Sequence, residues 1–121
     1  MVAKVKFDPS MGAVVTCSEL AVTRDSMRET IRLITSELAA NDCRRLFVDM
    51  SSAQIQVSTH EMTFVLDQLL NATHGDLRLA LVINAAGKPQ GEYASDYLSA
   101  EAVEVEIFTC PDQARLWIVA A

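Results

Sequence analysis

The residues best suited to chemistry lie in two short clusters near the middle of the chain. The first follows the apolar run Leu46-Phe47-Val48 and consists of one carboxylate and two hydroxyls, Asp49, Ser51 and Ser52. The second is the run Ser58-Thr59-His60. A carboxylate with hydroxyls can bind a ligand or a metal ion. A hydroxyl at the start of a helix can carry a phosphate, which the free N–H groups and the helix dipole stabilise.

Each cluster also has a purely structural interpretation. Asp49 is expected to accept hydrogen bonds from the turn at residues 51–53, as Asp does in such turns. Ser58 is expected to be a helix N-cap, with Glu61 three residues later completing a capping box. Asp49, Ser58 and His60 are close in the chain, but no G-x-S-x-G nucleophile elbow exists, so we predict no catalytic residues.

No other motif indicates a metal or a cofactor. The two histidines and three cysteines are too far apart in sequence for a metal site, and we predict neither a metal nor a cofactor. The segment Gly87-Lys88-Pro89 fails the Walker pattern, which requires Gly where Val82 stands and Ser or Thr where Pro89 stands. The cysteines are expected to be reduced and buried.

Composition limits the class of protein. The length of 121 residues, half of them hydrophobic, predicts one domain with a real core. The net charge of −6 argues against a nucleic-acid partner and against an anionic membrane surface. No apolar run is long enough to insert into a membrane, and the N-terminus lacks the apolar core of a signal peptide. We therefore expect a cytoplasmic protein.

Strands and helices alternate along the chain. Predicted strands span residues 4–7, 13–17, 45–50, 77–83 and 103–107, and predicted helices span 23–40, 58–70, 92–102 and the segment from 111 onward. Asn41 is expected to end the first helix in the left-handed conformation, and residues 84–91 are expected to form a loop. The order β-β-α-β-α-β-α-β-α predicts an α/β domain with an N-terminal hairpin, a mostly parallel sheet and about four helices.

This order and several short motifs resemble the STAS, or SpoIIAA-like, family of anti-sigma-factor antagonists. The motifs are the strand end Leu46-Phe47-Val48-Asp49-Met50-Ser51, the helix start Ser58-Thr59 and the closing Ala114-Arg115-Leu116-Trp117, which is similar to a bacterial STAS/SEC14-like subgroup. The resemblance covers nearly the whole chain in topology and implies a single STAS-like domain over residues 1–121. It implies a non-enzymatic interaction domain in which a hydroxyl at the Ser58/Thr59 helix start is phosphorylated and controls binding of a protein partner. Here Ser58 lacks the preceding Asp, and Thr59 the following Gly, of the usual family run.

Two functions remain open at this stage, and a third, an uncharacterised enzyme, is disfavoured because the sequence shows no convergent set of acid, base and nucleophile. The first is partner docking through residues 51–59 and the next helix, with phosphate or nucleotide at the helix start. The second, which the SEC14 side of the resemblance implies, is binding of a small apolar or lipid-like molecule. The residues that could wall its pocket are Met50, Met62, Tyr93, Tyr97 and Trp117. Glu104 and Glu106 discourage pairing of their edge strand with a strand of a second copy. A homodimer that forms through helices is therefore the remaining kind of self-association.

Overall fold

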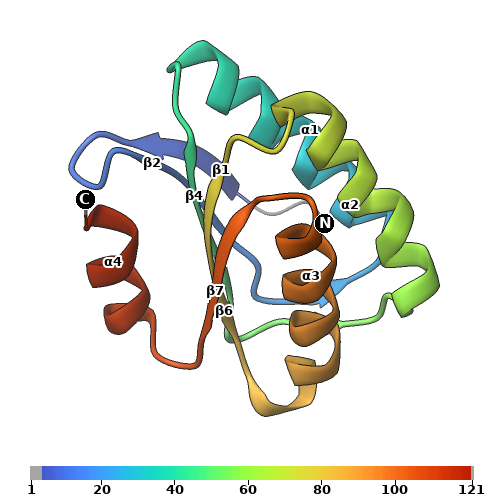
Figure 1. The fold of residues 1–121 in the computed structure, drawn as a ribbon. Helices are drawn as coiled ribbons and strands as arrows, with labels where there is room; N and C mark the ends of the chain where they lie inside the picture. The colour runs from blue at the N-terminus through green and yellow to red at the C-terminus, as the bar shows by residue number, and fades with distance from the viewer. Residues whose placement is uncertain (1–3, 121) are drawn as a thin grey trace.

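The chain folds as a five-stranded sheet with helices on both faces (Figure 1). The structure is a computed structural model, and it describes residues 4–120. Its elements are β1 (Lys4–Asp8), β2 (Ala13–Cys17), β3 (Ala21–Val22), α1 (Arg24–Ala40), β4 (Arg45–Met50), β5 (Gln54–Ile55), α2 (Thr59–Thr73), β6 (Arg78–Ile83), the 3₁₀ turn η1 (Ala85–Gly87), α3 (Lys88–Ala100), β7 (Glu104–Phe108) and α4 (Pro111–Val119).

The strand order is β1-β2-β4-β6-β7. Only β1 and β2 are antiparallel, and every other pair in this sheet is parallel. The predicted fold class is thereby confirmed: a single α/β domain with an N-terminal hairpin, a mostly parallel sheet and four helices. The parallel arrangement brings the carboxyl ends of β2, β4 and β6 to one edge of the sheet, where α/β proteins place their binding sites.

Three helices cover one face of the sheet and one helix covers the other. In Figure 1, α1, α2 and α3 lie on one side of the strands and α4 lies alone on the opposite side. The side chains of β4 divide accordingly, because successive strand residues point to opposite faces. Leu46 and Val48 join the larger core under α1–α3, whereas Phe47 joins the smaller core under α4. The unbroken apolar run in β4 therefore correctly predicted a strand covered on both sides.

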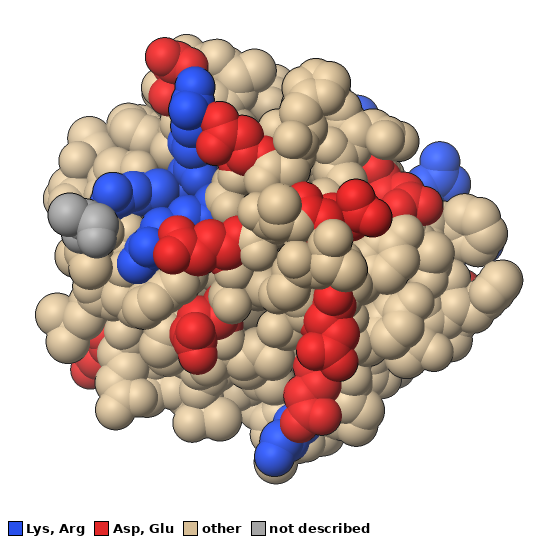
Figure 2. All heavy atoms as spheres, viewed as in Figure 1, with Lys and Arg blue, Asp and Glu red and all other residues tan. Residues whose placement is uncertain are grey.

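Two arginines from the sheet hold the carboxyl end of α4. Arg45 donates a hydrogen bond to the Ile118 carbonyl (3.0 Å) and Arg78 donates to the Trp117 carbonyl. The Arg78 guanidinium also lies 3.9 Å from the centre of the Trp117 ring and 2.8 Å from a Glu104 carboxylate oxygen. These positive charges meet the negative end of the helix dipole. Figure 2 shows Lys and Arg side chains gathered near the carboxyl end of α4, with Asp and Glu side chains beside them and across the visible face.

Several local predictions were wrong. The segment 84–91 is not a loop, because η1 and then α3 begin there, and Pro89 sits in the first turn of α3, where its missing N–H costs nothing. Asn41 ends α1 with φ −108°, and Asp42 takes the left-handed conformation instead. The short pair β3 and β5 was not predicted. It forms a separate two-stranded sheet that holds the connection before α2.

The cysteines are only partly as expected. All three are free thiols, but Cys43 and Cys110 are half-buried and Cys17 is exposed, so none is a buried core residue. Both histidines are exposed, and His74 ends α2 in the left-handed conformation. Within residues 4–120, no helix has the length and apolar character needed to cross a bilayer.

Candidate functional site

The start of α2 is built as a capping box. Ser58 Oγ accepts a hydrogen bond from the Glu61 backbone N–H, and a Glu61 carboxylate oxygen accepts one from the Ser58 backbone N–H, each at 3.1 Å. Hydrogen bonds from the backbone N–H and the side chain of Ser58, with a smaller contribution from the nearby Arg24, lower the pKa of the Glu61 carboxyl from its ordinary value. Ser58 is therefore the predicted N-cap, and its oxygen already has a structural partner.

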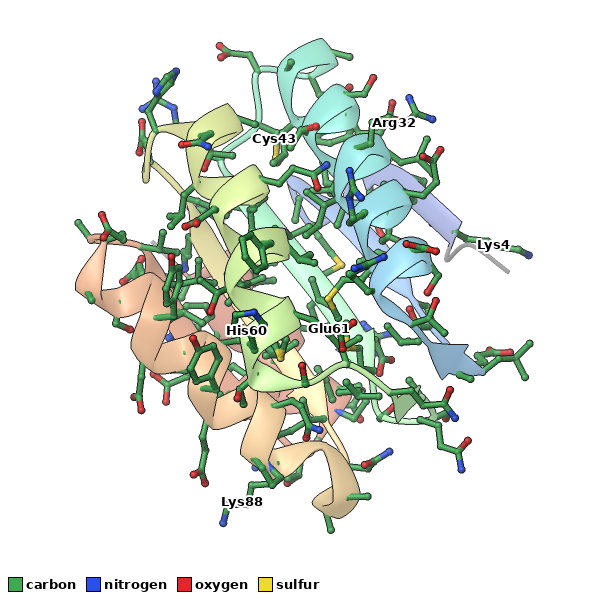
Figure 3. The ribbon with its side chains drawn as sticks, turned by 90° about the vertical axis from the view of Figure 1, so that its right-hand side faces the viewer. Lys4, Arg32, Cys43, His60, Glu61 and Lys88 are labelled. Atoms are coloured by element: carbon green, nitrogen blue, oxygen red, sulfur yellow. The ribbon has the colours of Figure 1, made fainter. Side chains whose placement is uncertain are left out.

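The next residues of α2 face outward. Thr59 is exposed, and its hydroxyl makes no hydrogen bond within the part of the chain that the structure describes. His60 is exposed and packs edge-on against the ring of Phe64, with the ring centres 5.4 Å apart. Figure 3 shows Glu61 on the side of α2 that faces α1 and His60 on the outward side. A free hydroxyl, an imidazole and a phenyl ring are thus all exposed in the first two turns of α2.

Phe64 is the most unusual residue of this surface. Its side chain is 63% exposed, although it stands in the middle of a helix whose apolar residues are otherwise directed at the core. A surface groove between α1 and α2 begins beside it. The groove is lined by Arg24 and Arg28 from α1 and by Phe64, Asp67, Gln68, Asn71 and Ala72 from α2.

The charge of the groove differs from that of the whole chain. The protein carries a net charge of −6, yet the α1 side of the groove presents two arginines. The Arg28 guanidinium forms no ion pair within residues 4–120. Across from it, Asp67 accepts a short hydrogen bond from the Tyr97 hydroxyl, so its charge is partly directed away from the groove. Arg24 is paired with Asp25 (3.4 Å). The groove therefore combines an apolar ring with one arginine, Arg28, that has no ion-pair partner within residues 4–120.

The other predicted cluster lies elsewhere. Asp49 alternates with Val48 along β4 and so projects on the α4 side of the sheet, away from α2. It accepts hydrogen bonds from the Ser51 N–H (3.0 Å) and the Ser51 hydroxyl (2.6 Å), which is the predicted structural role. Ser52 is exposed. The structure therefore does not bring Asp49, Ser51 and Ser52 together with Ser58 and Thr59, and Asp49, Ser58 and His60 form no hydrolytic set.

The loop after β4 is fixed by the loop after β6. The Asn84 side-chain amide donates to the carbonyls of Ser51 (3.1 Å) and Ala53 (2.9 Å). Beside this loop end, burial and then the carboxylates of Asp49 and Glu19 raise the pKa of the Cys17 thiol. A thiol held in its protonated form is a poor nucleophile. The carboxyl edge of the sheet is therefore a hydrogen-bonded support for the start of α2.

The five residues predicted to wall an apolar pocket lie in three different places. Met50 and Met62 line a small cavity between the sheet and α1, α2 and α3. Tyr93 and Tyr97 stack on each other at the α2–α3 contact, with the Tyr93 hydroxyl 2.6 Å from that of Thr63. Trp117 lies on the opposite face of the sheet against Phe108. They do not form one pocket.

Phe64, Arg24 and Arg28 were missed by the sequence reasoning. A signal for Phe64 was present, because it falls outside the apolar stripe of Met62, Val65, Leu66 and Leu69. The arginines carried no such signal, since their position across from Phe64 depends on how α1 and α2 pack against each other.

Comparison with known proteins finds no relative of this chain. The chain matches no protein-family model, no curated protein and no solved structure. What the structure shows is an α/β fold with a mixed, mostly parallel sheet and four helices.

Proposed function

We propose that this protein is a non-enzymatic, STAS-like interaction domain that docks a protein partner on the exposed face of α2 and the adjoining α1–α2 groove. The observation that carries the proposal is the exposed Phe64 ring beside a groove. Aromatic residues and arginine are the types enriched at the energetic centres of protein interfaces. The exposed ring and two arginines of this groove match that composition.

The partner segment should combine apolar and acidic side chains. An apolar side chain would cover Phe64, and a carboxylate would pair with Arg28, which has no ion-pair partner within residues 4–120. The net charge of −6 would repel such a segment from the acidic parts of the surface, which favours docking where arginines are exposed, as they are in this groove. The groove would therefore both attract the partner segment and fix its orientation.

Regulation would act through a phosphate at the start of α2. Thr59 is a better site for this phosphate than Ser58. Its hydroxyl is exposed and unbonded, whereas the Ser58 oxygen already caps the helix and lies next to the Glu61 carboxylate. A phosphate carries about −1.5 to −2 charges at neutral pH. On Thr59 it would repel an acidic partner that approaches the start of α2.

The docking surface is tested by affinity capture from extract of the native cells, read by mass spectrometry. Baits are the wild type, Phe64→Ala and Leu116→Ala, the last being a matched control because Leu116 is 73% exposed on α4, across the sheet. We expect a partner that binds wild type and Leu116→Ala and is lost with Phe64→Ala. Partners that bind all three baits equally would place the interface elsewhere.

The switch is tested with charge-matched pairs on the same partner. Thr59→Glu is compared with Thr59→Gln, and Ser58→Asp with Ser58→Asn, since Asp and Asn are both good N-caps and differ only in charge. We expect Thr59→Glu to weaken binding at least about tenfold relative to Thr59→Gln, the factor that corresponds to 1.4 kcal/mol. Equal affinities for both members of each pair would refute phosphate control at this helix start.

A further inference from the structure

The two outer strands of the sheet carry opposite charges on the same face. β1 and β7 are the ends of the five-stranded order, and no other strand within residues 4–120 pairs with their outer sides. On the α4 side of the sheet, β1 presents Lys4 and Lys6, and β7 presents Glu104 and Glu106. All four side chains are exposed. One sheet therefore ends in a basic edge, β1, and an acidic edge, β7.

The other side of both edge strands is apolar. Val5 and Phe7 of β1, and Val105 and Ile107 of β7, are half-buried at the margin of the larger core. The two edges thus share one alternation of charged and apolar residues. A sheet that continues into a second copy with the same face towards α4 places β1 antiparallel to β7, because β1 runs opposite to β2 and the other strands are parallel to β2.

The outer side of β7 also offers backbone hydrogen-bonding groups. The Glu104 N–H donates to the Leu77 carbonyl on the β6 side at 3.1 Å. Successive residues of a parallel strand direct their N–H and C=O groups to opposite sides, so those of Val105 and Ile107 point away from β6. An added strand would satisfy these groups.

The charges decide which strand can be added. Charged side chains on an edge usually prevent pairing with another chain. Two β7 strands would bring glutamates together, which is the repulsion expected from the sequence, and two β1 strands would bring lysines together. β1 against β7 places opposite charges across from each other, which stabilises a cross-strand pair. Two of the three possible pairings are therefore disfavoured, and one is favoured.

We propose that this chain associates with copies of itself head to tail, with β1 of one copy antiparallel to β7 of the next. The register is set by Val5 opposite Val105. Lys4 then lies opposite Glu106, and neither has an ion-pair partner within residues 4–120. The contact joins two different surfaces, so it gives a growing chain of copies rather than a two-fold dimer. It is separate from the α1–α2 groove of the proposed function.

Sedimentation velocity of the full chain tests the association. The contact is made mainly by two strands of five residues, so it should be weak. Concentrations from about 10 μM to about 1 mM cover the affinity of such an interface. We expect the sedimenting mass to rise with concentration and to pass that of a dimer. A monomer at every concentration, or an assembly that stops at the dimer, would overturn the head-to-tail contact.

Charge reversal tests the pairing of the two edges. Lys4→Glu alone and Glu106→Lys alone each bring like charges together and should weaken association about fivefold. Glu106→Lys is the sharper test, because it reduces the net negative charge and would by itself favour association. An equimolar mixture of the two variants should associate as wild type does, because the reversed charges then meet each other. A variant that failed to fold could not be restored in this way.

Two control variants make the same changes of charge away from the edges. Arg44 and Asp76 form an exposed ion pair of 2.8 Å, and they precede the interior strands β4 and β6. Arg44→Glu and Asp76→Lys should leave association unchanged. Controls that weaken association as much as the edge variants, or a mixture that does not restore it, would refute the pairing of β1 with β7.

Amide hydrogen exchange, followed by NMR, tests whether the contact is made by paired strands. Exchange at Val105 and Ile107 should slow as the protein is concentrated, because their N–H groups gain acceptors from β1 of the next copy. Exchange at Glu106 should stay constant, since its N–H already faces β6. Association without any change at Val105 and Ile107 would overturn strand pairing.

Discussion

Replacing Ser58 by Ala tests whether the hydroxyl at the start of α2 is a structural cap. The substitution leaves the Glu61 backbone N–H without the side-chain acceptor that it now has at 3.1 Å. Loss of an N-cap Ser costs about 1 kcal/mol. For a chain of 121 residues, that loss corresponds to a decrease in Tm of about 3–5 °C. Thr59→Ala is the control, and should change stability by less than about 0.5 kcal/mol because the Thr59 hydroxyl is exposed and unbonded.

The measurement is urea denaturation of wild type and both variants at neutral pH and again in acid. The hydrogen bonds from Ser58 lower the pKa of Glu61 below its ordinary value of 4.5 in the folded state. The contribution of Glu61 to stability is therefore fully present above that value and is lost as pH falls through the lowered pKa. The difference between wild type and Ser58→Ala should shrink in acid. A Thr59→Ala variant as unstable as Ser58→Ala would refute this account of the helix start.

Three further predictions concern the support of the fold. Replacing Gly75 by Ala should destabilise the protein by about 1–3 kcal/mol in denaturant, because Gly75 has φ +76° and a Cβ there would lie 2.9 Å from a backbone carbonyl oxygen. Arg78→Met should cost about 2 kcal/mol and increase acrylamide quenching of Trp117, the single tryptophan, because the Trp117 ring loses the guanidinium beside it and α4 loses one of its two hydrogen bonds from arginines. The hydrogen bond to Asp67 and burial raise the pKa of Tyr97 to about 12, and ¹³C NMR titration should show it return toward 10 in Asp67→Asn.

The framework of the fold was predictable because its signals are local. The apolar run in β4, the alternation of apolar and charged residues in β7 and the capping box at Ser58 each depend on residues adjacent in sequence. The repeated strand–helix alternation then leaves few possible topologies, since parallel crossovers are right-handed. These features can therefore be predicted from the sequence alone.

The features that were missed depend on distant contacts. The strands β3 and β5 have two residues each and exist only because Ala21 and Val22 lie beside Gln54 and Ile55. The early start of α3 is stabilised by its packing, since Gly91 allows the helix to approach so closely that a Cβ there would lie 2.7 Å from Ile83. Gly and Pro near a helix start look like a loop in sequence, although Pro is compatible with a first turn.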